Sequence, residues 1–184
     1  MVKLISTLIG FALLIYLLFL ASTHLYEPAR NFNLPGLLWF THLMLLYIHE
    51  AGHLIFSLFG RTLYILGGSL MQVIAPLAWF IIALRDGSKL SNVALVFTGI
   101  SIIDVSVYVK DAGMLLLPLI GGLSKAHHDW LNLARQYGFT DYTYEIGEGM
   151  FWCGVLTALY GIGAGVVIAI REFQESPAVP EMID

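Results

Sequence analysis

The feature that most constrains this chain is its series of apolar runs, each close to the length that crosses a lipid bilayer. A membrane-spanning helix needs about 20 consecutive, mostly apolar residues. Of the 184 residues, 58% are hydrophobic and only 12% are charged, about half the charged fraction of an ordinary soluble domain. A water-soluble protein of this size could not bury so much apolar sequence, because folded chains leave much of their surface exposed. The composition therefore predicts an integral membrane protein.

The apolar runs predict an all-α, polytopic membrane helix bundle of about five spans, placed as a multi-pass protein in the cell membrane. Loops that contain charged residues, glycine and proline separate the runs. We expect one membrane-embedded domain, residues 1–171, followed by an acidic flexible tail, residues 172–184. The expected spans are residues 4–21, 35–59, 71–84, 92–109 and 149–170.

Three segments outside these spans have patterns of their own. Residues 61–70 combine β-branched and aromatic residues with a glycine pair, which predicts a short hairpin or re-entrant strand after the second span. Residues 113–122 are apolar but interrupted by a proline and two glycines, which predicts a re-entrant or broken segment. The amphipathic spacing of residues 124–137 predicts a short helix.

Charge and cysteine content exclude two classes of function. The net charge of -4 arises from four acidic residues near the C-terminus, and the remaining acidic and basic residues balance. No basic stripe is present that could neutralise phosphates, which argues against nucleic-acid binding. The single cysteine, Cys153, lies inside an apolar run, which excludes a disulfide framework and a cysteine-based zinc site.

The second span contains the segment His49-Glu50-Ala51-Gly52-His53. Residues i and i+4 of a helix share one face, so both imidazoles can bind one metal ion. Glu50 lies one step round the helix, where its carboxylate can take a proton from a water. Each ionisable group inside a span costs about 2.5–3.5 kcal/mol on insertion scales, so we expect a metal ion to offset them. The alternative is a hydrogen-bonded polar cluster inside the bundle.

The stretch LLYIHEAGHLIFSLFG resembles the metal-binding helix of the site-2 proteases, intramembrane zinc metalloproteases, in their short, domain-free form. The resemblance implies that His49 and His53 bind Zn²⁺ and that Glu50 is catalytic. In that family the third ligand is an Asp from a later segment, which commonly follows a Leu-Pro stretch with nearby glycines. Here residues 117–122 read LPLIGG and Asp129 follows them.

Asp129 is the first candidate for the third ligand, because a carboxylate completes a His₂-acid zinc set with one position open for water. His128 is the alternative ligand, or a group that supports the ligands or stabilises an oxyanion. Asp104 lies in the middle of the fourth span, where it either orients a ligand histidine or is itself the third ligand. The N-terminus of a surface helix would also favour Asp129 without any metal.

Other polar residues of the spans have weaker expected roles. Asp111 lies near a membrane boundary, which predicts a solvated side chain. His42 precedes His49 by seven residues and shares its helical side, so it either lines the cavity or is a buried core histidine. Gln72 and Asn92 are candidates for holding a substrate backbone.

The leading hypothesis is a zinc metalloendopeptidase of site-2 protease type that hydrolyses transmembrane protein substrates within or near the bilayer. The strand-like residues 61–66 would pair with an unwound substrate by β-augmentation. Without a soluble domain, selection of substrates depends on the spans, the loops, a partner subunit or a second copy of the chain. The alternatives are a metal-binding regulatory protein without proteolysis, and a proton-relay transporter whose histidines, Glu50 and Asp104 form a titrating chain.

Overall fold

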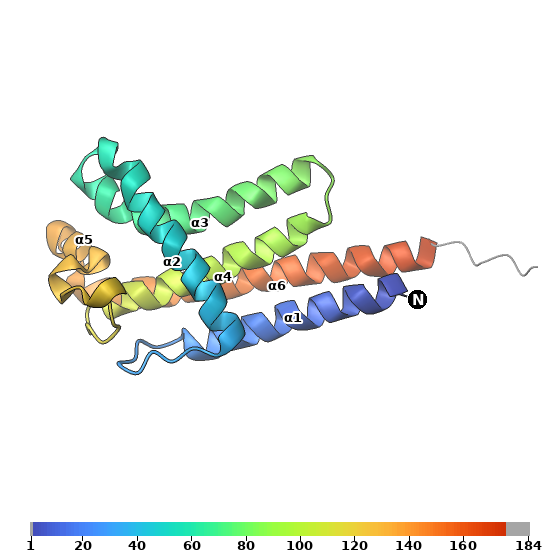
Figure 1. Ribbon diagram of the computed structural model, residues 1–184, viewed down its shortest axis with the longest axis horizontal. Coiled ribbons are helices and arrows are strands. Elements are labelled where there is room, and N and C mark those ends of the chain that lie inside the picture. Colours follow the sequence, from blue (N-terminus) through green and yellow to red (C-terminus); the bar gives the residue numbers. More distant parts are fainter. Residues whose placement is uncertain (1, 176–184) are drawn as a thin grey trace, which may run out of the picture.

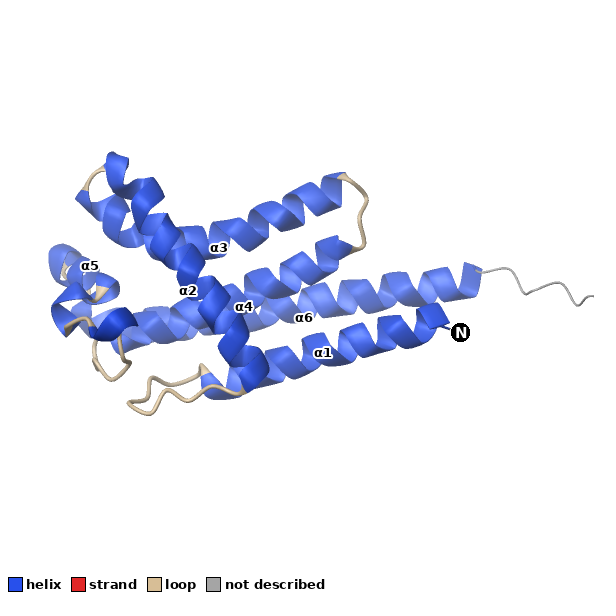
Figure 2. Ribbon diagram, in the orientation of Figure 1, coloured by secondary structure: helices blue, strands red, loops and turns tan. Residues whose placement is uncertain are grey.

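The computed structural model describes residues 2–175, which contain six α-helices, short turns of 3₁₀-helix and no strand (Figure 2). All helices except α5 are long and apolar enough to cross a membrane. The expected all-α bundle is thereby confirmed. The helices are α1 (Val2–His24), α2 (Gly36–Phe56), α3 (Arg61–Arg85), α4 (Leu90–Asp111), α5 (Asp129–Tyr137) and α6 (Thr143–Glu175).

α4 is the central helix of the bundle. It runs beside α6 and α1 along the long axis, while α2 crosses these helices obliquely (Figure 1). In α4, 72% of the apolar stretch is buried, against at most 33% in the other four long helices. α4 packs against α6 and also against α3, so it links the apolar core to the helices that carry the polar residues of interest.

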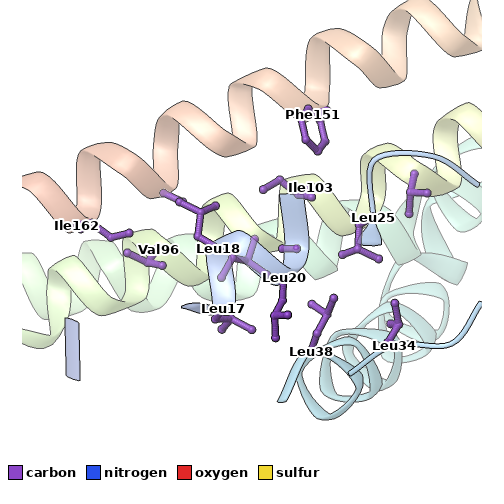
Figure 3. Close-up of a cluster of buried hydrophobic side chains, with 14 of the residues drawn as sticks. Leu17, Leu18, Leu20, Leu25, Leu34, Leu38, Val96, Ile103, Phe151 and Ile162 are labelled. Carbon is purple, nitrogen blue, oxygen red and sulfur yellow. The ribbon is translucent and has the colours of Figure 1, made fainter. Parts of the chain in front are cut away.

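An apolar core joins α1, α2, α4 and α6 (Figure 3). α4 and α6 approach closely at Gly99 and Gly154, where a Cβ atom on Gly154 would lie 2.7 Å from the Gly99 carbonyl oxygen. Small residues are the usual means by which membrane helices pack backbone against backbone. Core side chains labelled in Figure 3 include Leu17, Leu20, Leu38, Val96, Ile103, Phe151 and Ile162.

An ion pair between buried Lys110 and partly exposed Glu148 fastens the loop after α1 to this core. The Lys110 side chain is fully buried, and its Nζ donates to Glu148 Oε2 at 2.6 Å and to the Tyr26 carbonyl at 2.9 Å. The same ammonium lies 4.1 Å from the centre of the Tyr26 ring. A buried charge needs partners of this kind to offset its lost hydration. The cluster therefore has a structural role.

The expected hairpin or re-entrant strand over residues 61–70 is wrong, because these residues form the first part of α3. α3 begins directly after Gly60, whose φ of +90° ends the preceding segment. The glycine pair that suggested a turn packs against α2 instead, and a Cβ on Gly67 would lie 2.6 Å from the Cβ of Phe56. The third long helix thus covers residues 61–85 rather than 71–84, and residues 61–66 offer no strand edge to a substrate.

The remaining boundaries differ by smaller amounts. Residues 113–122 form a loop with a single 3₁₀ turn at Ile120–Gly122, as a broken segment predicts. The short helix expected over residues 124–137 begins only at Asp129. α6 extends beyond the expected span in both directions and includes the first residues of the predicted tail. The rest of that tail, residues 176–184, lies outside the described residues.

Candidate metal centre

The structure brings His49, His53 and Asp129 together, although Asp129 lies 80 positions after His49 in the sequence. Oδ2 of Asp129 lies 3.1 Å from His49 Nε2 and 3.2 Å from His53 Nε2. One ligand atom from each residue lies within 4.8 Å of the other two. Ligands bound at about 2.0–2.1 Å around a tetrahedral ion are about 3.3 Å apart. The three side chains could therefore hold a metal ion.

The hydrogen bond at Nδ1 of each imidazole determines whether Nε2 carries a proton or a lone pair. Nδ1 of His49 lies 3.0 Å from Gln72 Oε1, and Nδ1 of His53 lies 2.7 Å from the Tyr64 carbonyl oxygen. Both partners accept hydrogen bonds, so both Nδ1 atoms donate. In a neutral ring each Nε2 then presents a lone pair toward the Asp129 carboxylate. Three converging lone pairs of this kind are what a bound cation requires.

The Asp129 carboxyl is held in its charged form, which is the form that binds a metal ion. Burial raises the pKa of Asp129, but hydrogen bonds from the two facing imidazoles, when their Nε2 atoms carry protons, outweigh burial and hold that pKa below its usual value. When both Nε2 atoms instead present lone pairs, a bound cation would hold the carboxylate charged in place of those protons. Its backbone N–H donates to Tyr108 Oη at 3.1 Å, and the same oxygen lies 3.5 Å from Asp129 Oδ2. Tyr108, from α4, therefore positions both the backbone and the carboxylate of this residue.

Glycines let α2 and α3 approach closely enough to form the site. A Cβ on Gly68 would lie 2.4 Å from His49 Nε2, so this position leaves room for the imidazole ring. A Cβ on Gly52, between the two histidines, would lie 2.3 Å from the Gly67 carbonyl oxygen. The backbones of the two helices are therefore in contact beside the metal ligands.

A buried hydrogen-bonded chain extends from His49 to α4. The Gln72 amide accepts from His49 and donates from Nε2 to Asp104 Oδ2 at 2.6 Å. The other oxygen of Asp104 lies 2.6 Å from Nδ1 of His42. Asp104 therefore reaches His49 through Gln72 and is not part of the group of three. Partners of this kind orient a ligand histidine and set its tautomer.

Pro76 explains why the main-chain carbonyl of Gln72 is bound by a side chain of α4. A proline has no N–H, so Pro76 cannot donate to the Gln72 carbonyl one turn earlier. Oγ of Ser101 in α4 donates to that carbonyl at 2.6 Å instead. An unpaired carbonyl inside a membrane would be costly, so the replacement bond ties α3 to α4 at the residue that orients His49.

His128 does not join the metal group, because both of its ring nitrogens are engaged elsewhere. Nδ1 accepts from the Leu131 backbone N–H at 3.3 Å and caps α5, and Nε2 lies 3.2 Å from Asp111 Oδ2. Both side chains are fully buried, so the expected solvated role of Asp111 is wrong. The loop after α4 covers Asp111, whose Oδ1 accepts two backbone N–H groups of that loop. These bonds place Asp129 at the start of α5.

A cavity of about 400 Å³ opens onto the three candidate ligands. Glu50 lines it and is exposed, on the same helix as the two histidines. His42 also lines it, whereas Asn92 lies beside a different cavity, between α1, α4 and α6. Both ends of the Gln72 amide are already paired. Gln72 and Asn92 are therefore not placed to hold a substrate backbone as expected.

Sequence reasoning missed the contacts that fasten α5 over the site. Trp130 Nε1 donates to Ser69 Oγ at 3.0 Å. Farther along the same pair of helices, Thr62 Oγ1 lies 2.7 Å from the hydroxyl of Tyr137 and accepts from Gln136 at 3.1 Å. No local sequence signal could reveal these bonds, because they depend on how α5 docks on α3.

Comparison with known proteins found no match for this chain among family models, curated proteins or solved structures. A function must therefore be argued from the candidate ligands, the exposed glutamate and the cavity. These features lie among helices that are long and apolar enough to span a membrane.

Proposed function

We propose that this chain is an intramembrane zinc metalloprotease that cleaves transmembrane protein substrates within or near the bilayer. The observation that carries the proposal is the convergence of His49, His53 and Asp129 on a cavity that Glu50 also lines. Two imidazoles and one carboxylate form a catalytic zinc set that leaves one position open for water. The His49-Glu50-x-x-His53 spacing is also the one that resembles the site-2 proteases.

Glu50 is the proposed general base. When bound, zinc polarises the scissile carbonyl and lowers the pKa of a water. Because Glu50 adjoins His49 and lines the cavity, its carboxylate can take the proton from that water and later donate it to the leaving amine. General acid–base catalysis of this kind contributes about 10²–10⁴-fold to the rate.

We further propose that α1, α2, α3, α4 and α6 cross the cell membrane, which makes the chain a multi-pass protein. Large apolar side chains such as Leu8 and Leu156 point outward and are more than half exposed, as lipid-facing residues would be. α5 is short and amphipathic, so it would lie at the boundary and close the site there. Substrate selection would then depend on the helices and loops, a partner subunit or a second copy.

The two other functional classes, a proton-relay transporter and a metal-binding regulatory protein, require different properties of the same residues. A proton relay needs groups that exchange protons, but the Gln72 amide lies between Asp104 and His49. A metal-binding regulatory protein would share the metal group and differ only in lacking hydrolysis. Cleavage that depends on Glu50 separates that class from a protease.

The test compares three forms of the protein, each co-expressed with candidate membrane substrates: the wild type, Glu50→Gln and Glu145→Gln. Glu145 is an exposed glutamate on α6 that does not line the cavity, so its variant is a matched control. We expect a cleavage product with the wild type and the control, and none with Glu50→Gln at unchanged zinc content. Equal product from Glu50→Gln would contradict the proposed base, and zinc without product in all three forms would indicate the regulatory class.

A further inference from the structure

A membrane substrate that unwinds for cleavage exposes main-chain groups that need hydrogen-bond partners. Inside an apolar environment these groups cannot be left unpaired without a large cost. Residues 2–175 contain no strand whose edge could pair with them. We therefore expect polar side chains of the cavity to hydrogen-bond the main chain of the substrate. Side chains whose polar atoms are already paired with one another or with the metal group are not available for this role.

One face of α2 forms a wall of the cavity over much of its length. Cavity-lining residues recur from His42 to His53, which is about 16 Å along a helix. Near His53 the lining includes polar and charged side chains such as Arg61 and Asn132. Toward the other end of this face it becomes mainly apolar, with Phe32, Leu46, Val107 and Leu117.

His42 lies in that apolar part, and within residues 2–175 only one of its two ring nitrogens has a hydrogen-bond partner. Its Nδ1 lies 2.6 Å from Asp104 Oδ1, and its ring meets the Phe32 ring edge to face at 5.2 Å. The side chain is 25% exposed. Every buried side-chain nitrogen or oxygen of the described residues has a hydrogen-bond partner. Nε2 of His42 has no such partner there, so this atom is not buried. Nε2 of His42 is therefore accessible, on a residue that lines the cavity.

We propose that His42 is a substrate-binding residue whose Nε2 hydrogen-bonds one main-chain group of an extended substrate, about three to five residues from the scissile bond. The inference depends on the proposed function. His42 precedes the metal-binding pair by about 10–16 Å along α2, and an extended peptide rises about 3.3 Å per residue. Asp104 acts through His42, because its carboxylate aims the ring and occupies Nδ1.

A histidine that serves only to pair with Asp104 would behave differently, and two variants distinguish the roles. In His42→Asn the side-chain amide lies near the former Nδ1 and can still donate to Asp104, but no atom replaces Nε2. His24→Asn is the matched control, because His24 is exposed at the end of α1 and does not line the cavity.

The experiment measures the binding of a synthetic 22-residue leucine-rich transmembrane peptide with a central Gly-Ser pair. The protein is the zinc-loaded Glu50→Gln form, so binding is read without hydrolysis. Single amide-to-ester replacements scan the peptide, since each one removes one N–H donor and weakens the adjacent carbonyl. We expect one ester to weaken binding about 5- to 10-fold, the size of one hydrogen bond. That penalty should vanish in His42→Asn and persist in His24→Asn.

The proposal is overturned if His42→Asn weakens the binding of every peptide by the same factor, or leaves the pattern of the scan unchanged. A failure of the proposed function would look different. The wild-type protein would then release no product from the peptide while the penalty that depends on His42 remained. Absence of peptide binding in every form would overturn both proposals.

Discussion

Two glycines, one at the contact of α4 with α6 and one at the contact of α2 with α3, have different purposes. Between α4 and α6, a Cβ on Gly154 would strike the backbone of the opposite helix, so this glycine brings two helices together. Between α2 and α3, the three atoms nearest to a Cβ on Gly68 would all belong to the His49 ring. The first glycine serves the fold and the second serves the site. The two glycines differ in the group that each one faces on the neighbouring helix, and the local sequence does not reveal that group.

Buried polar groups differ between the same two regions. The Lys110–Glu148 pair in the core has its partners within the structure and does not line the cavity of the metal group. The chain from His49 through Gln72 and Asp104 to His42 ends at a cavity. A polar cluster whose groups are all paired within the protein is typical of structural support. A cluster that ends at a cavity provides groups that can bind a ligand.

The largest effect should come from the third ligand. Asp129→Ala removes one of three converging ligand atoms. Loss of a residue that only hydrogen-bonds a ligand lowers metal affinity about 10- to 100-fold, and we expect the loss in Asp129→Ala to be larger. Asp104→Ala should stay within that smaller range. Zinc titration of both purified variants makes the comparison, and retention of zinc by Asp129→Ala with loss in Asp104→Ala would reverse the assignment.

The glycine comparison is tested by Gly68→Ala and Gly154→Ala. The first variant should displace the His49 ring and lose most zinc binding with a small change in thermal stability. The second should keep the site but strain the contact of α4 with α6, which costs about 1–3 kcal/mol of stability for an overpacked position. Zinc content and Tm measured together decide between these outcomes, and equal loss of both in the two variants would erase the distinction.

The sequence predicted the helix bundle and the two histidines, because hydropathy and an i, i+4 spacing are local properties. It also indicated Asp129, but only through a family resemblance. Residues 61–70 were misread, since a glycine pair signals a turn unless another helix packs on it. Gln72 and Asp111 were missed as supports of the site, because their roles depend on partners 17 to 32 residues away in the chain.

A smaller effect is expected from Gln72→Met, which keeps the approximate length of the side chain but removes the amide between His49 and Asp104. Loss of this partner should lower zinc affinity about 10- to 100-fold. Ser101→Ala is the control, since it disturbs the Gln72 carbonyl and leaves the side-chain amide in place. Unchanged affinity in Gln72→Met would show that the open chain does not support the metal group.

The smallest effect should come from the docking of α5. Trp130→Phe removes the hydrogen bond to Ser69 while keeping most of the aromatic surface. We expect a loss of about 1 kcal/mol in stability and little change in zinc affinity, because Asp129 keeps its bonds to Tyr108. Thermal unfolding at saturating and limiting zinc measures both quantities. A loss of affinity as large as that of Gln72→Met would place Trp130 among the supports of the site.

The most direct test of the metal centre is the zinc content per polypeptide of detergent-purified protein, with His49→Ala prepared in parallel. A metal centre at His49, His53 and Asp129 predicts about one zinc in the wild type and none in the folded variant. Folded wild-type protein without zinc, or equal zinc in both forms, would contradict it.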